Sequence, residues 1–112
     1  MFSIMKLFTM NFKLMNWKLK KKYNGKVLTI RGYFANIKAD YNGTYYLGLC
    51  HLYSRNMNFF DSLKVYLKDS SLYNDINYSN GDVVAVKGYF TFKYLGEMKN
   101  AEIVKIKSNS FF

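Results

Sequence analysis

The strongest constraint on the fold is the pattern of residues 26–107, where apolar and polar side chains alternate and only short turns interrupt them. A period of two is typical of β-strands, because successive side chains of a strand point to opposite faces. A short helix, capped by Asp69, Ser70 or Ser71 and reaching about Asn77, is expected after the third stretch. We therefore predict a mainly β protein whose strands cover residues 27–37, 44–53, 63–67, 83–93 and 101–107.

The order of these elements narrows the architecture further. Three strands, one short helix and two more strands follow one another in the order of an OB-fold, a five-stranded Greek-key barrel. Closing the barrel also removes the exposed edges of an open sheet. The second strand has an ambiguous register, because Leu47 and Leu49 indicate one face while Tyr46, Cys50 and Leu52 indicate the other, so a bulge or burial on both faces is expected. We predict an OB-fold domain over residues 23–112.

Residues 1–22 show a different, helical periodicity. Apolar side chains recur every three or four residues from Met1 to Leu19, while Lys6, Lys13 and Lys20 share another face, which predicts a basic amphipathic helix. The helix could dock on the barrel, lie on a membrane or bind a partner protein. A further alternative is that part of the segment is a frayed leader, since the methionines within it are potential starts.

Two strands carry the same local motif, an apolar residue followed by a cation, glycine, tyrosine and phenylalanine, at residues 30–34 and 86–90. Glycine inside a strand usually marks a bend or a close backbone approach, so Gly32 and Gly88 have an architectural interpretation. In an OB barrel the first and fourth strands are neighbours, which would place the cations and tyrosines of the two motifs in adjacent outward rows. Rings beside cations suit single-stranded nucleic acid, where bases stack and phosphates pair with charge.

The charge of the chain favours a polyanionic partner. Lys and Arg number 17 against 7 Asp and Glu, so the net charge is +10, and residues 1–39 carry nine cations and no acid. Such a field attracts nucleic acid or an anionic membrane surface. The candidate nucleic-acid-binding residues combine the outward faces of the strands with the loops that OB-folds use for ligands. They are Arg31, Tyr33, Lys38, Tyr41, Tyr46, Lys64, Tyr66, Lys87, Tyr89, Lys93, Tyr94 and Lys99.

Catalytic and metal chemistry find little support in the sequence. Cys50 and His51 are the only cysteine and histidine, and as strand neighbours they point to opposite faces. No glycine-rich phosphate loop is present, and the aspartates fall at turns or caps. We expect no enzyme activity, no cofactor, no metal and no small-molecule substrate. Apolar runs are too short for a membrane span or a signal peptide, so a cytoplasmic protein is expected.

Four segments resemble a known family. Residues 22–32, 42–47, 64–67 and 81–88, the last with its Gly-Asp-x-Val-x-Val-x-Gly pattern, look like the tRNA-anticodon-binding-like OB-fold proteins of bacteria and their mobile elements. The resemblance covers about residues 11–107. It implies an OB-fold and at most nucleic-acid binding, with no shared catalytic set. This chain departs from the family in being more basic and aromatic and in its segment 54–61.

From these observations we expect a protein that binds single-stranded nucleic acid with little sequence specificity, DNA ahead of RNA, in replication, conjugation or repair. The chain is rich in amino acids with AT-rich codons, such as Lys, Asn, Tyr, Phe and Ile, and this bias fits a phage or plasmid. The alternative is a protein-interaction module or membrane-surface adaptor that docks through the helix of residues 1–22, although a membrane is the less favoured partner. Association into homo-oligomers, or with replication or conjugation proteins, stays open, because the apolar stripe and Phe111–Phe112 could serve either contact.

Overall fold

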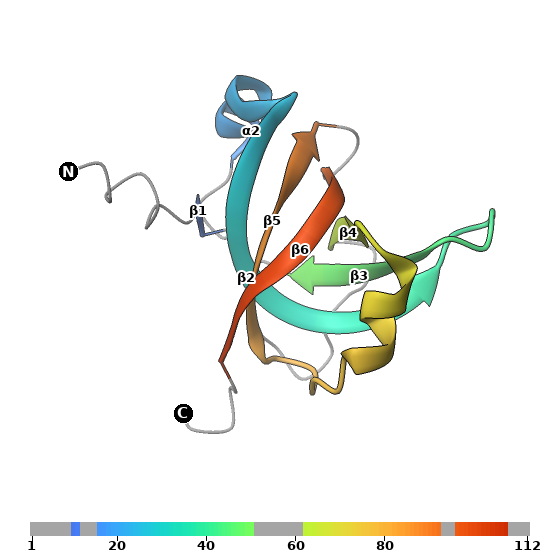
Figure 1. Cartoon of the computed structure of the whole chain (residues 1–112). Helices are drawn as coiled ribbons and strands as arrows, with labels where there is room; N and C mark the ends of the chain where they lie inside the picture. The colour runs from blue at the N-terminus through green and yellow to red at the C-terminus, as the bar shows by residue number, and fades with distance from the viewer. Residues whose placement is uncertain (1–9, 12–15, 51–61, 93–95, 108–112) are drawn as a thin grey trace.

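The computed structural model describes residues 10–11, 16–50, 62–92 and 96–107, and its centre is a closed five-stranded barrel (Figure 1). Its strands are β2 (Lys26–Ala39), β3 (Tyr45–Cys50), β4 (Leu63–Leu67), β5 (Val83–Thr91) and β6 (Glu97–Lys107). They are hydrogen-bonded in the order β2-β3-β4-β6-β5, and pairing of β5 with β2 closes the barrel. Only β4 and β6 run parallel within it. The predicted OB-fold barrel is confirmed.

Strand β2 serves both halves of the barrel because it bends. Its first part pairs with β5 as far as Tyr33, and its second part pairs with β3 from Tyr33 to Ala39. The register shifts between Phe34 and Asn36, and both Phe34 and Ala35 are buried. Strict alternation would point Ala35 outward, and the irregularity that coils the strand is the reason it is buried. Figure 1 shows β2 as one curved ribbon.

The core consists of the side chains that point into the barrel. Leu28, Ile30 and Phe34 of β2 lie inside, as their alternation predicts. In β3, Leu47 and Leu49 belong to the core cluster, while Tyr46 and Cys50 on the opposite face are buried as well. The prediction of burial on both faces of this strand is thus confirmed. The fully buried side chains with the largest volumes are Phe90, Ile30, Leu47, Leu49, Leu63, Met98, Val65, Val84 and Val86.

A 3₁₀ helix, η3 (Ser70–Asp75), lies between β4 and β5 where a short helix was predicted. The side chain of Asp69 caps it by accepting from the Ser71 amide at 3.0 Å. Leu72 and Ile76 pack against the core. The hydroxyl of Tyr73 accepts from the Leu67 amide at 2.9 Å and donates to the Tyr45 carbonyl at 2.8 Å, so it joins η3 to two strands.

The N-terminal helix is shorter than the sequence pattern indicates. Helix α2 (Trp17–Tyr23) begins after Asn16, whose side chain accepts from the Leu19 amide at 3.0 Å. Before it, β1 (Met10–Asn11) pairs in parallel with Ile30 and Arg31 of β2. Met10 and Asn11 fall within the helix predicted over residues 1–22 but form a strand. Their pairing satisfies backbone groups on the edge of β2 that extends past the end of β3. The rest of the predicted apolar stripe before Asn16 lies outside the described residues.

Helix α2 is tied to the barrel at its C-terminal end. The Asn24 side chain accepts from the Phe92 amide at 2.7 Å, and the Gly25 amide donates to the Phe90 carbonyl at 2.8 Å. Gly25 has a φ of +80°, a conformation that glycine adopts without strain. The turn at residues 23–25 thus places α2 beside the start of β2 and the end of β5. Segment 54–61, His51 and Phe111–Phe112 lie outside the described residues.

Candidate nucleic-acid interface

The turn between β2 and β3 is organised by the carboxylate of Asp40. Its Oδ1 accepts from the amides of Asn42 at 2.9 Å and Thr44 at 3.0 Å, and Gly43 supplies the positive φ of +82° that the turn needs. Its Oδ2 accepts from the hydroxyl of Tyr66 on β4 at 3.2 Å. These bonds fix the turn against the barrel wall and leave Tyr41 at its tip 97% exposed.

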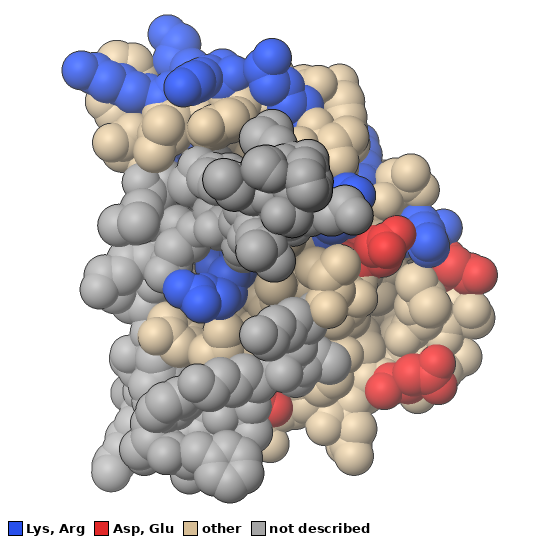
Figure 2. All heavy atoms as spheres, turned by 60° about the vertical axis from the view of Figure 1, so that its left-hand side comes forward, with Lys and Arg blue, Asp and Glu red and all other residues tan. Residues whose placement is uncertain are grey.

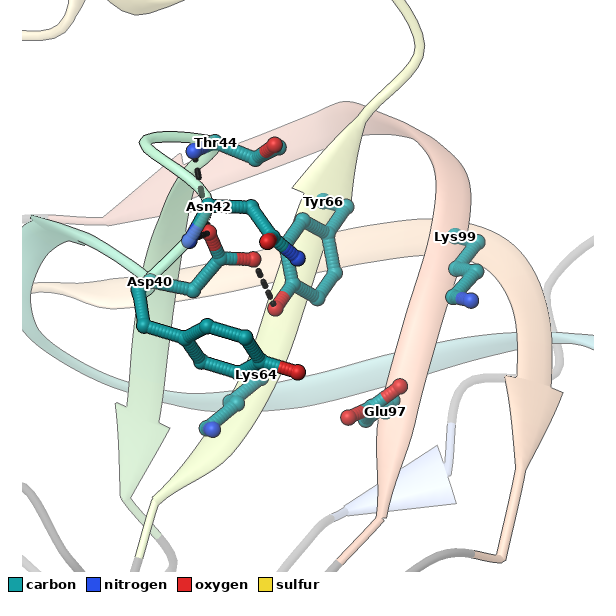
Figure 3. Close-up of a pocket in the computed structure, with 8 residues that line it drawn as sticks. Asp40, Asn42, Thr44, Lys64, Tyr66, Glu97 and Lys99 are labelled. Carbon is teal, nitrogen blue, oxygen red and sulfur yellow. Dashed lines mark hydrogen bonds between the residues drawn. The ribbon is translucent and has the colours of Figure 1, made fainter.

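A groove with a volume of about 530 Å³ lies between this turn and the outer faces of β4 and β6 (Figure 3). We call it the turn groove. From β4 it receives Lys64 and Tyr66, and from β6 it receives Glu97 and Lys99. The complete lining is Asp40, Tyr41, Asn42, Thr44, Lys64, Tyr66, Glu97 and Lys99. Its size falls in the range of about 300–1,000 Å³ that small-molecule-sized ligands occupy.

Hydrogen bonds, burial and nearby charges shift the pKa values of Asp40 and Tyr66 in the turn groove. The backbone amide of Thr44, with smaller contributions from Asn42, Tyr66 and Lys64, holds the pKa of Asp40 below its ordinary value. Partial burial, followed by the nearby charge of Asp40, raises the pKa of Tyr66 to about 12. Glu97 contributes to this rise, so its charge is felt across the groove. At neutral pH, Tyr66 is a neutral hydroxyl and Asp40 is an anion with its acceptors in use.

The outer wall continues from the turn groove towards α2. Lys99 of β6 is the cross-strand partner of Tyr89 on β5, and Tyr89 is the partner of Val27 on β2. Tyr89 is 44% exposed. Lys87 lies two residues further along β5, on the same face and also exposed. The wall therefore offers the ring of Tyr89 between the groove and the helix, while Lys87 lies farther from the helix and opposite Glu102 of β6.

Helix α2 carries the most basic surface of the described residues. Trp17 is 59% exposed, and the ammonium groups of Lys18 and Lys21 lie 5.9 and 5.4 Å from its ring centroid. With Lys22 these three residues form what we call the basic helix surface. Figure 2 shows a row of Lys and Arg side chains at this end of the molecule, while further Lys and Arg side chains lie lower on the same face, some of them beside Asp and Glu side chains.

The structure divides the predicted binding residues between these places. Those of the turn groove are Tyr41, Lys64, Tyr66 and Lys99. Those exposed on the wall of β2 and β5 are Arg31, Lys87 and Tyr89. Lys38 is exposed opposite Tyr46, at the end of β2 that leads into the turn. Lys93 and Tyr94 lie outside the described residues.

One expectation about the tyrosines was wrong. Tyr46 was expected to be exposed but is buried at 7%, since its ring packs 5.6 Å from that of Tyr66 and under the Lys64 ammonium at 5.3 Å. Tyr33 and Tyr89 were expected in adjacent outward rows. They lie on the neighbouring strands β2 and β5, and the antiparallel register places Tyr33 opposite Val83 and Tyr89 opposite Val27, which separates them by about 20 Å along the sheet.

The repeated glycine motifs are offset for the same reason. Gly32 pairs with Val84 and Gly88 pairs with Leu28, so Arg31 and Lys87 lie diagonally rather than directly opposite each other. Sharing a motif therefore does not bring equivalent residues together on antiparallel strands. The neighbouring position of the two strands, however, is as predicted.

Sequence reasoning missed several residues of this surface. Trp17 was not singled out among the apolar residues of the N-terminal segment, although its position among three nearby lysines is a usable signal. Asn42, Thr44 and Glu97 were passed over as turn residues. Only the closure of the barrel brings Glu97 to Lys64, its cross-strand partner.

The described residues hold neither a metal cluster nor a membrane-spanning helix. Within that part of the chain, His, Cys, Asp and Glu side chains form no group of three that could hold a metal ion. No helix there is long and apolar enough to cross a membrane. Cys50, the only cysteine of the sequence, is buried.

Comparison with known proteins supports the fold through one solved structure. The sequence matches no protein-family model and no curated protein. Among solved structures, the chain is similar to a Klebsiella pneumoniae protein provisionally described as a nucleic-acid-binding lipoprotein, with a TM-score of 0.56 and 20% identity. The match covers 92% of this chain and 96% of that one. At this identity the likeness shows a shared OB-like fold, while membership of the tRNA-anticodon-binding-like family stays a prediction.

This comparison also corrects the expected location. The Klebsiella protein is described as a lipoprotein, and an attached lipid holds a protein at a membrane. The expectation of a plainly cytoplasmic protein is wrong by this finding, and we do not keep it. What the likeness supports is the fold, a closed barrel.

Proposed function

We propose that this protein binds single-stranded nucleic acid, DNA in preference to RNA, as a non-enzymatic protein that covers a few nucleotides per barrel. The observation that carries the proposal is the continuous outer wall from the basic helix surface through Tyr89 and Lys99 into the turn groove. A structural neighbour described as a nucleic-acid binder supports the general class of ligand, although only distantly.

Charge supplies the first part of the argument. The basic helix surface and the first part of β2 carry Lys18, Lys21, Lys22 and Arg31, and no Asp or Glu occurs before Asp40 in the sequence. On the neighbouring wall, Lys87 of β5 lies opposite Glu102 of β6. Phosphates that pair with such cations release condensed counterions, so affinity falls as salt rises. Contacts of this kind position a strand without reading its sequence.

Exposed rings supply the second part. Trp17, Tyr89 and Tyr41 are 59%, 44% and 97% exposed, and they lie at the helix, on the wall and at the rim of the turn groove. A base stacked on an aromatic side chain contributes about 1–3 kcal/mol, and every base has a face that can stack. Stacking requires unpaired bases, which favours a single strand over a duplex.

The proposal is tested by fluorescence anisotropy with labelled single-stranded DNA, the matching duplex and RNA of the same sequence, each titrated at several salt concentrations. We expect the tightest binding to single-stranded DNA, with affinity that falls steeply but persists as salt rises. Equal and wholly salt-sensitive binding to all three would contradict the proposal, and it would favour the interaction-module alternative.

A pair of tyrosine variants tests the wall itself. Tyr89→Ala is expected to weaken binding severalfold with little change in thermal stability, because it removes an exposed ring. Tyr45→Ala is the matched control, since Tyr45 is 55% exposed but packs towards Tyr73 of η3, outside the wall. Unchanged affinity in Tyr89→Ala would exclude stacking at this position.

A further inference from the structure

We infer that the turn groove holds one base of the bound strand and selects a base with an exocyclic amino group, so that cytosine is preferred to uracil or thymine, through the carboxylate of Glu97. The inference rests on the proposed function and adds a preference at one subsite. Elsewhere the strand is held by phosphates and stacking.

The acceptors of the turn groove are not equivalent. Asp40 is already the acceptor for the amides of Asn42 and Thr44 and for the hydroxyl of Tyr66. Glu97 accepts no hydrogen bond from any of the described residues, and it is only partly exposed. Glu102, on the same strand but outside the groove, is instead bound by Lys68 at 3.1 Å. Among the described residues, Glu97 is therefore the groove carboxylate with both oxygens available to a donor from a ligand.

Donors lie close to this acceptor. Lys64 is the cross-strand partner of Glu97, and Lys99 lies two residues along β6 on the same face. Figure 3 shows Lys64, Glu97 and Lys99 on neighbouring strands along the groove that Asp40 and Tyr66 close on its other side. Tyr41, exposed at the rim, can cover a base from above.

Cytosine matches this arrangement and uracil does not. Cytosine presents an amino donor beside its N3 and O2 acceptors, which suits a carboxylate flanked by ammonium groups, and a carboxylate accepting from the amino group of cytosine is a known pairing. Uracil and thymine have a carbonyl oxygen where cytosine has its amino group. That oxygen would face the carboxylate at the position where cytosine places its donor. The N3–H of uracil and thymine is a donor, but it lies where cytosine offers its N3 acceptor to an ammonium group, so the base would have to shift, at a cost in affinity.

The test compares two DNA homopolymers of equal length, one of deoxycytidine and one of deoxyuridine, which differ only in the pyrimidine ring. Anisotropy with the full chain is expected to show about tenfold tighter binding to the cytosine strand, within the discrimination of a good base contact. In Glu97→Gln the ratio is expected to fall to about one, because the amide can donate to uracil as well as accept from cytosine.

Glu102→Gln is the matched control. It removes one negative charge from the same strand outside the groove, so it is expected to raise both affinities alike and to keep the tenfold ratio. Circular dichroism verifies that both variants fold.

The outcomes separate this inference from the proposed function. Equal affinity of the wild type for the two homopolymers would overturn the base preference while leaving single-strand binding intact. A ratio that persists in Glu97→Gln would overturn the role of Glu97. Absence of binding to either strand would overturn the proposed function and this inference with it.

Discussion

Gly88 on β5 is the position where the packing of the barrel wall can be tested most sharply. It is buried opposite Leu28 of β2, at a point where the β5–β6 register shifts. A Cβ at position 88 would lie 2.9 Å from the Cβ of Ala101, 3.0 Å from the carbonyl oxygen of Lys99 and 3.1 Å from the Cα of Ala101. Two of these three atoms are main-chain atoms of β6, which cannot move without disturbing the ladder.

Gly88→Ala is therefore expected to lower the free energy of unfolding. Forcing an extra methyl group into a packed site costs about 1–3 kcal/mol. The loss of glycine's freedom in the unfolded chain offsets about 0.4–1 kcal/mol of that. The net expectation is a destabilisation of about 1–2 kcal/mol, measured by urea denaturation followed by circular dichroism.

A double-mutant cycle identifies the obstacle. Ala101→Gly removes the closest of the three atoms, so the double variant Gly88→Ala/Ala101→Gly is expected to be more stable than the sum of the single effects by about 1 kcal/mol. Lys87→Ala, at the exposed neighbouring position, is expected to change stability by less than about 0.5 kcal/mol. If Gly88→Ala is as stable as the wild type, the close approach is wrong. If the changes in the free energy of unfolding caused by the two substitutions are additive, Ala101 is not the obstacle.

Two further predictions concern the turn groove and α2. Because the pKa of Tyr66 is raised to about 12 from an ordinary 10.0, the stability that the neutral hydroxyl confers is present below pH 10 and lost as pH rises through 12. Wild type should lose stability relative to Tyr66→Phe over that interval in urea melts, and parallel pH profiles would refute the raised pKa of Tyr66. Replacing Lys18, Lys21 and Lys22 by Gln should reduce the slope of log affinity against log salt by about 2, since each phosphate that a lysine neutralises on a single strand contributes about 0.7. An unchanged slope in salt titrations of single-stranded DNA would remove the basic helix surface from the interface.

The strand order and the inward faces could be predicted from the sequence because they depend on local pattern. Alternation placed Ile30 and Val86 inside, and both are fully buried. The position of the short helix followed from Asp69 as a cap, and the turn at residues 40–44 followed from Asn42–Gly43. Each of these signals acts over a few neighbouring residues, so no knowledge of distant contacts is needed.

The short strand β1 and the length of α2 required the tertiary structure. The apolar spacing of the N-terminal segment is compatible with one long helix, yet Met10–Asn11 pairs with β2 and α2 begins only after Asn16. Pairing along a free strand edge is a contact between distant residues, and it outweighs a helical periodicity that is weak in isolation.

Which residues make up the candidate site also depended on the tertiary structure. Sequence indicates that Tyr46, Tyr66 and Lys64 point outward, but only the folded barrel stacks them together and buries Tyr46. The antiparallel register separates Tyr33 from Tyr89, although their motifs are alike. Alternation determines which face of a strand a side chain takes. Its neighbours on that face depend on strand register and barrel closure, which are set by contacts across the whole chain.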